Sequence, residues 1–288
     1  MLLSTNLLGA LLALASAGLW GGGDFSGGFA ARRLSPILVL ALASFSGCVV
    51  LLACLLAARE SFMSLPGTLW AVGAGASGAL GTAALYRALA LGKAASVAPT
   101  AAVIGAALPV CFGIIAQGLP SVTRLAGFAV ALAGIWLVSQ AGARGGEGLV
   151  AESFGLACVS GVGFGGFFIL LSQADRGAVF MPVLLVRSTA LAISLGLLGL
   201  LRLRSVPALR AHPRALWVGS LAGVADAIGN ITYMLSKQTT RLDVATVLGS
   251  LYPAATVLLA CVVLKECVSR RQWLGVGLCL AAIVLIAL

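Results

Sequence analysis

Ten apolar runs, each about 20 residues long, fill almost all of this 288-residue sequence. A helix of about 20 residues spans the roughly 30 Å hydrocarbon core of a bilayer. Backbone N–H and C=O groups inside lipid must be bonded within their own segment, so each run is predicted to be a helix. The runs cover residues 6–31, 36–57, 66–89, 95–116, 121–141, 153–173, 181–201, 213–236, 243–264 and 269–288.

Composition and connection length support a membrane fold. Only 9% of the residues are charged, against about 25% in a soluble domain. The longest connections, 142–152 and 202–212, are too short for a soluble domain. The net charge of +10 comes mainly from basic residues in short loops, where they set topology or meet lipid headgroups. The predicted fold class is therefore an all-α integral membrane protein with ten transmembrane helices, with membrane lipid as a partner and no nucleic acid.

The two halves of the chain repeat one another in an ordered series of matches. Tyr86 matches Tyr233 at an offset of 147 residues, and Pro36 matches Pro182 at an offset of 146. Five spans, an odd number, make up each half, so the second half must enter the membrane upside down. Two inverted five-helix repeats are typical of secondary transporters, which place their substrate between the halves. The predicted units are 1–141, a linker at 142–152, and 153–288.

Two stretches carry a resemblance to a known family. DVATVLGSLYPAATVLL, from Asp243, and SVAPTAAVIGAALPVC, from Ser96, each resemble the proline-bearing helix of an EamA-type repeat. The chain is thereby identified as a member of the drug/metabolite transporter superfamily over nearly its whole length. One departure concerns the loop that follows this helix. Glu266 is preceded by Lys265 instead of glycine, and the first-half copy, Gln117-Gly118, lacks the glutamate.

The resemblance implies a transporter. We expect a secondary active or facilitative exporter of small metabolites, amino acids first, that works by alternating access as a monomer in the inner or plasma membrane. The alternative transporter is a multidrug exporter of cationic drugs, with protons as the coupling ion. An intramembrane enzyme or a scaffold subunit is the alternative from another class.

A polar stripe crosses the apolar run at 213–236. Asp226, Asn230, Tyr233 and Lys237 follow one another at helical spacing, so a helix places them on one face. An acid at the centre of a span costs roughly 2.5–3.5 kcal/mol on insertion scales and normally serves a function. We therefore expect Asp226, Asn230 and Tyr233 to line a substrate cavity. A structural pair that holds helices together is the alternative for the first two.

Two further charged residues lie inside apolar runs. Arg187 is about two turns into its run, too deep to reach the headgroups easily. It is expected to form an ion pair with an acid inside the bundle, or to bind a zwitterionic substrate together with that acid. Asp24 is expected to be a pocket or proton-coupling acid, and the alternative is a helix-end acid paired with Arg32 or Arg33.

Aromatic residues and prolines complete the candidate site. The aromatic residues could line an apolar pocket with a few polar groups, although ordinary helix packing explains each of them as well. Prolines in matched spans of the two halves are candidate hinges, or harmless kinks. The aromatic candidates are Trp20, Tyr86, Phe164, Phe168, Tyr233 and Tyr252, and the hinge candidates are Pro99, Pro109 and Pro253.

Two motifs suggest chemistry that the rest of the sequence does not support. Residues 161–166 satisfy the dinucleotide pattern GxGxxG but lie inside an apolar helix, without the preceding strand. Residues 75–78 have the GxSG form of an intramembrane serine protease, which needs a base. The one histidine, His212, lies in a basic loop. We therefore predict no enzyme activity, no cofactor and no metal.

The orientation of the termini has two conflicting indications. Twelve basic residues fall in loops opposite the termini and five on the same side, which favours termini outside the cytoplasm. The family resemblance implies termini in the cytoplasm.

Overall fold

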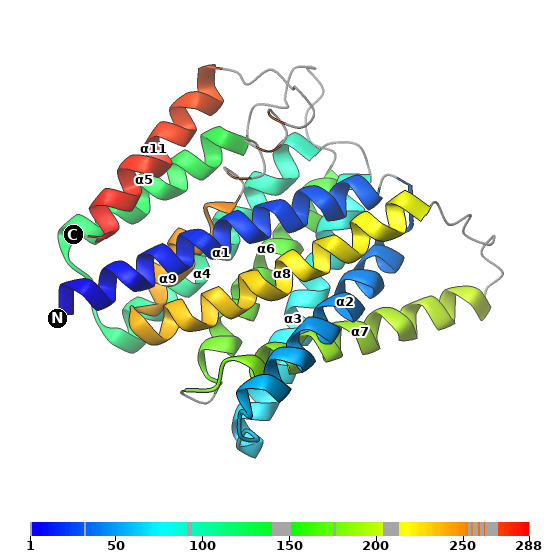
Figure 1. The fold of residues 1–288 in the computed structure, drawn as a ribbon. Coiled ribbons are helices and arrows are strands. Elements are labelled where there is room, and N and C mark those ends of the chain that lie inside the picture. The colour runs from blue at the N-terminus through cyan, green and yellow to red at the C-terminus, as the bar shows by residue number, and fades with distance from the viewer. Residues whose placement is uncertain are drawn as a thin grey trace.

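The structure is a computed structural model that describes residues 2–31, 33–90, 94–139, 151–174, 177–203, 213–252, 255, 259, 262 and 270–287. These residues form helices joined by short turns (Figure 1). The helices are α1 (Leu2–Ala31), α2 (Pro36–Ala58), α3 (Leu65–Ala90), α4 (Ala94–Gln117), α5 (Val122–Ser139), α6 (Ala151–Ser172), α7 (Phe180–Leu203), α8 (Pro213–Thr239), α9 (Leu242–Gly249) and α11 (Arg270–Ala287).

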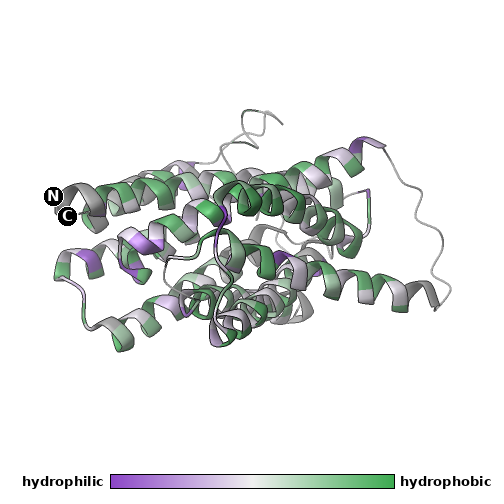
Figure 2. Ribbon diagram, turned by 60° about the horizontal axis from the view of Figure 1, so that its bottom comes forward, coloured by the Kyte–Doolittle hydropathy of each residue, from purple (hydrophilic) through white to green (hydrophobic). Residues whose placement is uncertain are grey.

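Six of the described helices contain segments long and apolar enough to cross a membrane. They carry large apolar side chains on their outer surfaces, Phe45 and Trp217 among them, and Figure 2 shows strongly hydrophilic residues at only a few positions. A soluble monomer rarely exposes so much contiguous apolar surface. The six spans are Asn6–Ala31, Pro36–Ala58, Leu65–Leu85, Gly155–Ser172, Phe180–Leu200 and Pro213–Thr239, and two shorter apolar helical stretches are Ala101–Ala116 and Val122–Leu137.

Helices from opposite halves of the sequence pack against each other. α1 lies antiparallel beside α8, and α3 packs against α6, α2 against α7, and α5 against α11 (Figure 1). In the duplication expected from the sequence, α1 corresponds to α6 and α8 to α3. The α1–α8 contact therefore has its counterpart in the α6–α3 contact, and α2–α8 has its counterpart in α7–α3. These contacts join the two halves of the chain along the length of the bundle.

Glycines allow these helices to approach closely. A Cβ added at Gly223 of α8 would overlap the carbonyl oxygen of Ala43 and the hydroxyl of Ser46 in α2. At the α3–α6 contact, a Cβ on Gly163 would lie 2.7 Å from the backbone of Gly81. Small residues at helix contacts are the usual way for helices in lipid to gain packing contacts.

Serine hydroxyls tie the same helix pairs together. Ser46 of α2 donates to the carbonyl of Ser220 at 2.7 Å, and Ser77 of α3 donates to that of Gly163 at 2.8 Å. Ser16 of α1 donates to the carbonyl of Gly229 in α8 at 2.8 Å. Each bond crosses between the two halves of the chain, so the halves form one continuous bundle.

The end of the bundle at which α2 joins α3, hereafter the termini end, is closed by polar contacts. The Glu60 carboxylate, just after α2, accepts hydrogen bonds from the N–H groups of Val179, Phe180 and Met181 at 2.9–3.1 Å. These N–H groups lie at the N-terminus of α7, where helical donors have no partner in their own helix. An acid from the first half therefore caps a helix of the second.

Two basic side chains add further contacts at the termini end. Lys237 near the end of α8 donates to the carbonyl of Leu171 at 2.6 Å. Arg241 pairs with the buried carboxylate of Asp243 at 3.0 Å and donates to the carbonyl of Gly118 at 2.8 Å. The second contact of Arg241 again joins the two halves.

The prolines of the two matched spans differ in their effect on the helix. In the run at 243–264, the interruption expected near Pro253 is present, because α9 ends at Gly249 and a turn follows at Ser250 and Leu251. A proline at 253 has no N–H for the carbonyl of Gly249, so an unbroken helix would leave that carbonyl without its partner. In contrast, α4 continues as a helix through Pro109 and is not interrupted there.

We predict that Gly223→Ala lowers the thermal stability of the purified protein in detergent. The new methyl group must displace the α2 backbone, which should cost roughly 1–3 kcal/mol of unfolding free energy, as overpacking usually does. Gly196→Ala in α7 is the matched control, because a Cβ at Gly196 meets no atom within 4 Å. An unchanged unfolding midpoint for Gly223→Ala would contradict the packing described above.

Candidate functional site

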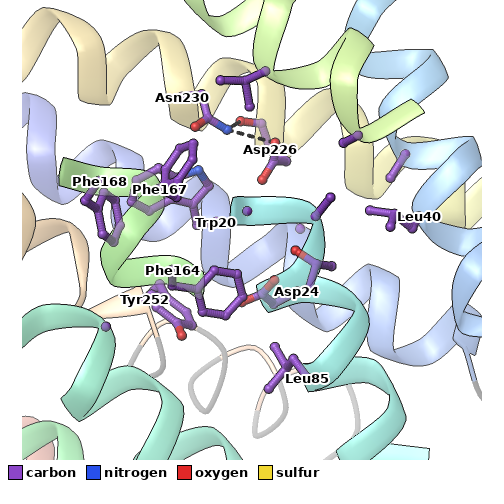
Figure 3. A pocket seen from close by; sticks show the side chains of 18 of the residues that line it. Trp20, Asp24, Leu40, Leu85, Phe164, Phe167, Phe168, Asp226, Asn230 and Tyr252 are labelled. Atoms are coloured by element: carbon purple, nitrogen blue, oxygen red, sulfur yellow. Dashed lines mark hydrogen bonds between the residues drawn. The ribbon is translucent and has the colours of Figure 1, made fainter. Parts of the chain in front are cut away.

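A cavity of about 1020 Å³, its open edge included, lies in the middle of the bundle. Side chains of α1, α2, α3, α4, α6, α7, α8 and the turn after α9 line it, so both halves contribute (Figure 3). A concave, largely apolar cavity with a few polar groups is the usual form of a small-molecule site. The predicted site residues that line the cavity are Trp20, Asp24, Phe164, Phe168, Arg187, Asp226, Asn230 and Tyr252.

An ion pair and an amide form the polar wall of the cavity. The guanidinium of Arg187 in α7 pairs with the carboxylate of Asp226 in α8. The same carboxylate accepts a hydrogen bond from the side-chain amide of Asn230, one turn later, at 2.8 Å (Figure 3). The predicted pairing of Arg187 with an acid inside the bundle is therefore present. Gly47 of α2 leaves space for the side chain of Arg187, whose Cδ would lie 3.6 Å from a Cβ added there.

Asn230 contributes an acceptor as well as a donor. The residue is only 1% exposed, and its Oδ1 is buried without a hydrogen-bond partner in the described part of the chain. A buried carbonyl oxygen without a partner costs free energy. A molecule in the cavity with an N–H or O–H group could satisfy it.

Asp24 of α1 projects into the cavity from the opposite half. Its neighbour Gly23 faces α8, where an added Cβ would lie 3.2 Å from the carbonyl of Ala222 and 3.6 Å from the N–H nitrogen of Asp226. Asp24 therefore lies level with the ion pair. It has no hydrogen bond or ion pair with any other described residue. The alternative, in which Asp24 is a helix-end acid, does not fit the described residues, because the Asp24 side chain lines the cavity.

An aromatic cluster closes one side of the cavity. The Trp20 ring contacts Phe168 and Tyr233 with centroids 5.6 Å and 5.5 Å apart, and Phe168 lies 5.1 Å from Tyr233. Trp20 fits between Gly229 and Gly249, where an added Cβ would lie 2.7 Å and 3.2 Å from the indole. Glycines thus allow the largest side chain of the site to sit inside the bundle.

Tyr233 belongs to the aromatic cluster and is not among the residues that line the cavity. It is fully buried, and its hydroxyl shares a hydrogen bond of 3.1 Å with Thr246 of α9. Tyr233 supports Trp20 and Phe168 from behind. Its prediction as a lining residue is wrong because its ring turns toward α9, one turn beyond the cavity.

Phe164 of α6 forms another part of the cavity wall. An added Cβ at Gly81 of α3 or Gly105 of α4 would lie 3.1 Å or 3.3 Å from Phe164, so its ring sits where three helices meet. In Figure 3, Phe164 and Asp24 project toward the same region of the cavity. This region combines a carboxylate with aromatic surface.

The sequence analysis missed several lining residues. Thr82 of α3, Phe167 of α6 and Ser250 after α9 line the cavity, and none of them carries a strong sequence signal. A threonine or serine in a membrane helix commonly bonds its own backbone, and Phe167 resembles any apolar residue of its run. Their positions on lining helices, at helical spacing from Ala79 and Phe164, were the available clues.

Some candidates lie outside what the structure describes. The side chains of Tyr86 and Pro99 and the whole of Pro253 are among the residues left undescribed. Pro109 is buried within α4. Among the described residues, no group of three His, Cys, Asp or Glu side chains could hold a metal ion.

Comparison with known proteins supports this architecture. Residues 153–288 match the EamA-like transporter family. Among solved structures, 28 chains are similar. One of them, described as "Crystal structure of protein", covers 96% of this chain and 95% of its own length, with a TM-score of 0.73 and 22% identity, and shows that the fold extends over both halves. No match is found among curated proteins. The second half of the chain, residues 153–288, is therefore similar to the EamA-like transporter family.

Proposed function

We propose that the protein is a secondary transporter that carries small metabolites through its central cavity by alternating access. One observation carries the proposal most strongly. Charged side chains from both halves meet around a cavity of about 1020 Å³ in the middle of an apolar bundle. Ionisable groups at this depth are costly and usually mark a substrate pathway.

Two inverted five-helix units, 1–141 and 153–288, are part of this proposal. Two equivalent contacts support it, because α1 packs against α8 and its counterpart α6 packs against α3, the counterpart of α8. Two units of this kind can rock against each other around a fixed central site, so that the site is open first to one side of the membrane and then to the other. Hinge roles for Pro99, Pro109 and Pro253 remain a prediction.

Amino acids and related small amines are the substrates we propose, exported across the inner or plasma membrane. The cavity offers an acid at Asp24, an amide at Asn230 and aromatic surface at Trp20 and Phe168. An ammonium group bonds to acids, and an apolar side chain of a metabolite packs on aromatic rings. The labelled compounds to test first in proteoliposomes are therefore amino acids, and absence of movement of any tested solute by folded protein would overturn the proposal.

The contacts at the termini end identify which interactions must break when the cavity opens toward that end. Glu60 holds α7 at this end, and Lys237 and Arg241 add contacts to backbone carbonyls. A buried apolar group that includes Leu171, Val183 and Met234 lies between these contacts and the aromatic cluster. Opening of the cavity toward the termini end must separate Glu60 from α7, because the two belong to different halves.

We predict that the Arg187–Asp226 pair stabilises the folded protein. Its effect on stability can be measured separately from any role in transport. Arg187→Gln or Asp226→Asn leaves one buried charge without its partner, which should cost roughly 3–5 kcal/mol. The double variant removes both charges and should recover much of the folded yield. Thermal unfolding in detergent checks the first effect. Transport by the double variant in proteoliposomes then reports whether the pair also serves the substrate, and equal stability of single and double variants would contradict the structural role.

We predict that Glu60→Ala increases opening at the termini end. Loss of the charged acceptor removes hydrogen bonds to three N–H groups, and a hydrogen bond to a charged group is worth about 1.5–3 kcal/mol. Alkylation of Met234→Cys, introduced in a variant without native cysteines, should become about tenfold faster or more. Arg59→Gly is the adjacent control, since Arg59 is exposed and has a φ of 50° that glycine adopts readily. Equal alkylation rates in the Glu60→Ala and unsubstituted backgrounds would show that Glu60 does not hold this end closed.

A further inference from the structure

The charges around the cavity do not cancel among the described residues. Three charged side chains line it, namely Asp24, Arg187 and Asp226. Two carboxylates against one guanidinium leave one negative charge when all three are ionised. Arg187 contacts Asp226 directly and its charge also acts on Asp24, so one guanidinium faces two carboxylates and one negative charge remains. A bound molecule with one positive charge would complete the balance.

The cavity offers two hydrogen-bond acceptors in addition to its ion pair. Asp24 offers carboxylate oxygens that accept hydrogen bonds, and the buried Oδ1 of Asn230 is a second acceptor without a partner in the described residues. The amide nitrogen of Asn230 is already used by Asp226 at 2.8 Å. Both acceptors thus favour a ligand with donors at two ends. A zwitterion presents an acceptor carboxylate at one end, and this carboxylate would have to displace Asp226 from Arg187.

Aromatic surface near Asp24 adds to the attraction for a cation. Phe164 projects toward the same region of the cavity as Asp24 (Figure 3), and Tyr252 lines the cavity too. The charge of Asp24 acts on Tyr252, which places the two near each other. A cation over an aromatic face gains about 0.5–2 kcal/mol, with the larger values where water is excluded.

We propose that the cavity is a site for small organic monocations, in which Asp24 is the counter-ion of an ammonium group and the Asn230 carbonyl accepts a bond from a second N–H group. The inference rests on the proposed transport function and narrows the proposed substrates, from amino acids and small amines in general to those that carry one net positive charge. Amino-acid amides and diamines with a single charge fit this description, and zwitterionic amino acids fit it less well. The ammonium group is recognised from the first half of the chain and the second donor from the other half.

A matched series of probes tests the charge class. Phenylalaninamide is a monocation, phenylalanine a zwitterion and N-acetylphenylalaninamide neutral, and all three share the same aromatic side chain. Calorimetry with the full-length protein in detergent should show that phenylalaninamide binds about tenfold tighter than phenylalanine or better, a difference of about 1.4 kcal/mol. Equal or tighter binding of phenylalanine would overturn the inference.

A substitution at Asp24 tests whether this residue causes the preference for the cationic probe. Asp24→Asn should remove the preference for phenylalaninamide and leave the binding of N-acetylphenylalaninamide within about twofold, because the neutral probe needs no counter-ion. The neutral probe therefore serves as the folding control. Asn230→Leu should weaken the binding of phenylalaninamide and of the neutral probe to the same extent, since both probes carry the amide N–H. A preference for the cation that survives Asp24→Asn would overturn the assignment.

Transport assays separate this inference from the proposed function. Proteoliposomes are loaded with each labelled probe, and leakage from protein-free liposomes is subtracted. Binding of phenylalaninamide without protein-dependent efflux of any probe would uphold the cation site and overturn the transport proposal. Efflux of phenylalanine at least as fast as that of phenylalaninamide would uphold transport and overturn the cation site.

Discussion

The ion pair between Arg187 and Asp226 is the interaction on which the centre of this structure depends. A lone charge inside an apolar bundle would cost several kcal/mol, and an opposite charge in direct contact removes much of that cost. The pair fixes α7 against α8 and orients the amide of Asn230 through the same carboxylate. Because the pair satisfies its own charges, it forms a stable polar wall. Asp24, from the other half of the chain, experiences the charge of Arg187 but forms no direct ion pair with a described residue, so it is the carboxylate left to bind a cation.

Close approach of helices makes the remaining architecture possible. Gly223 allows α2 against α8, and Gly163 allows α3 against α6. In lipid, helices gain little from the hydrophobic effect when they associate, so dispersion contacts and hydrogen bonds must hold them together. Serine hydroxyls that donate across the same contacts supply part of that attraction. These contacts join one half to the other, so the proposed rocking motion would require small adjustments along glycine-lined surfaces and release of the polar contacts at the termini end.

The sequence predicted the helices and the charged and amide side chains of the cavity, which are Asp24, Arg187, Asp226 and Asn230. Each leaves a signal in apolar run length or in a polar residue where lipid would forbid one. The Arg187–Asp226 contact was one of two stated possibilities, because sequence spacing gives the depth of a residue and not its partner. Tyr233 was misplaced because its position on the stripe does not reveal how far the cavity extends along α8. The cap by Glu60 on α7 could not be predicted, since it depends on how two loops distant in sequence meet.

The difference between the halves bears on the proposed alternating-access mechanism, in which one site serves two conformations. Under the offset that aligns Tyr86 with Tyr233, the positions equivalent to Asp226 and Asn230 are Ala79 and Ala83, and Ala79 lines the cavity. The same helical level therefore presents polar groups from the second half and a methyl group from the first. Asp24 is the charge that the first half contributes. A ligand held between Asp24 and Asn230 would contact both units at once, and its binding energy would depend on their relative position. Only such a difference in affinity between conformations allows a ligand to shift their populations, so under the proposed mechanism a site divided between the two halves would couple substrate binding to the rocking motion.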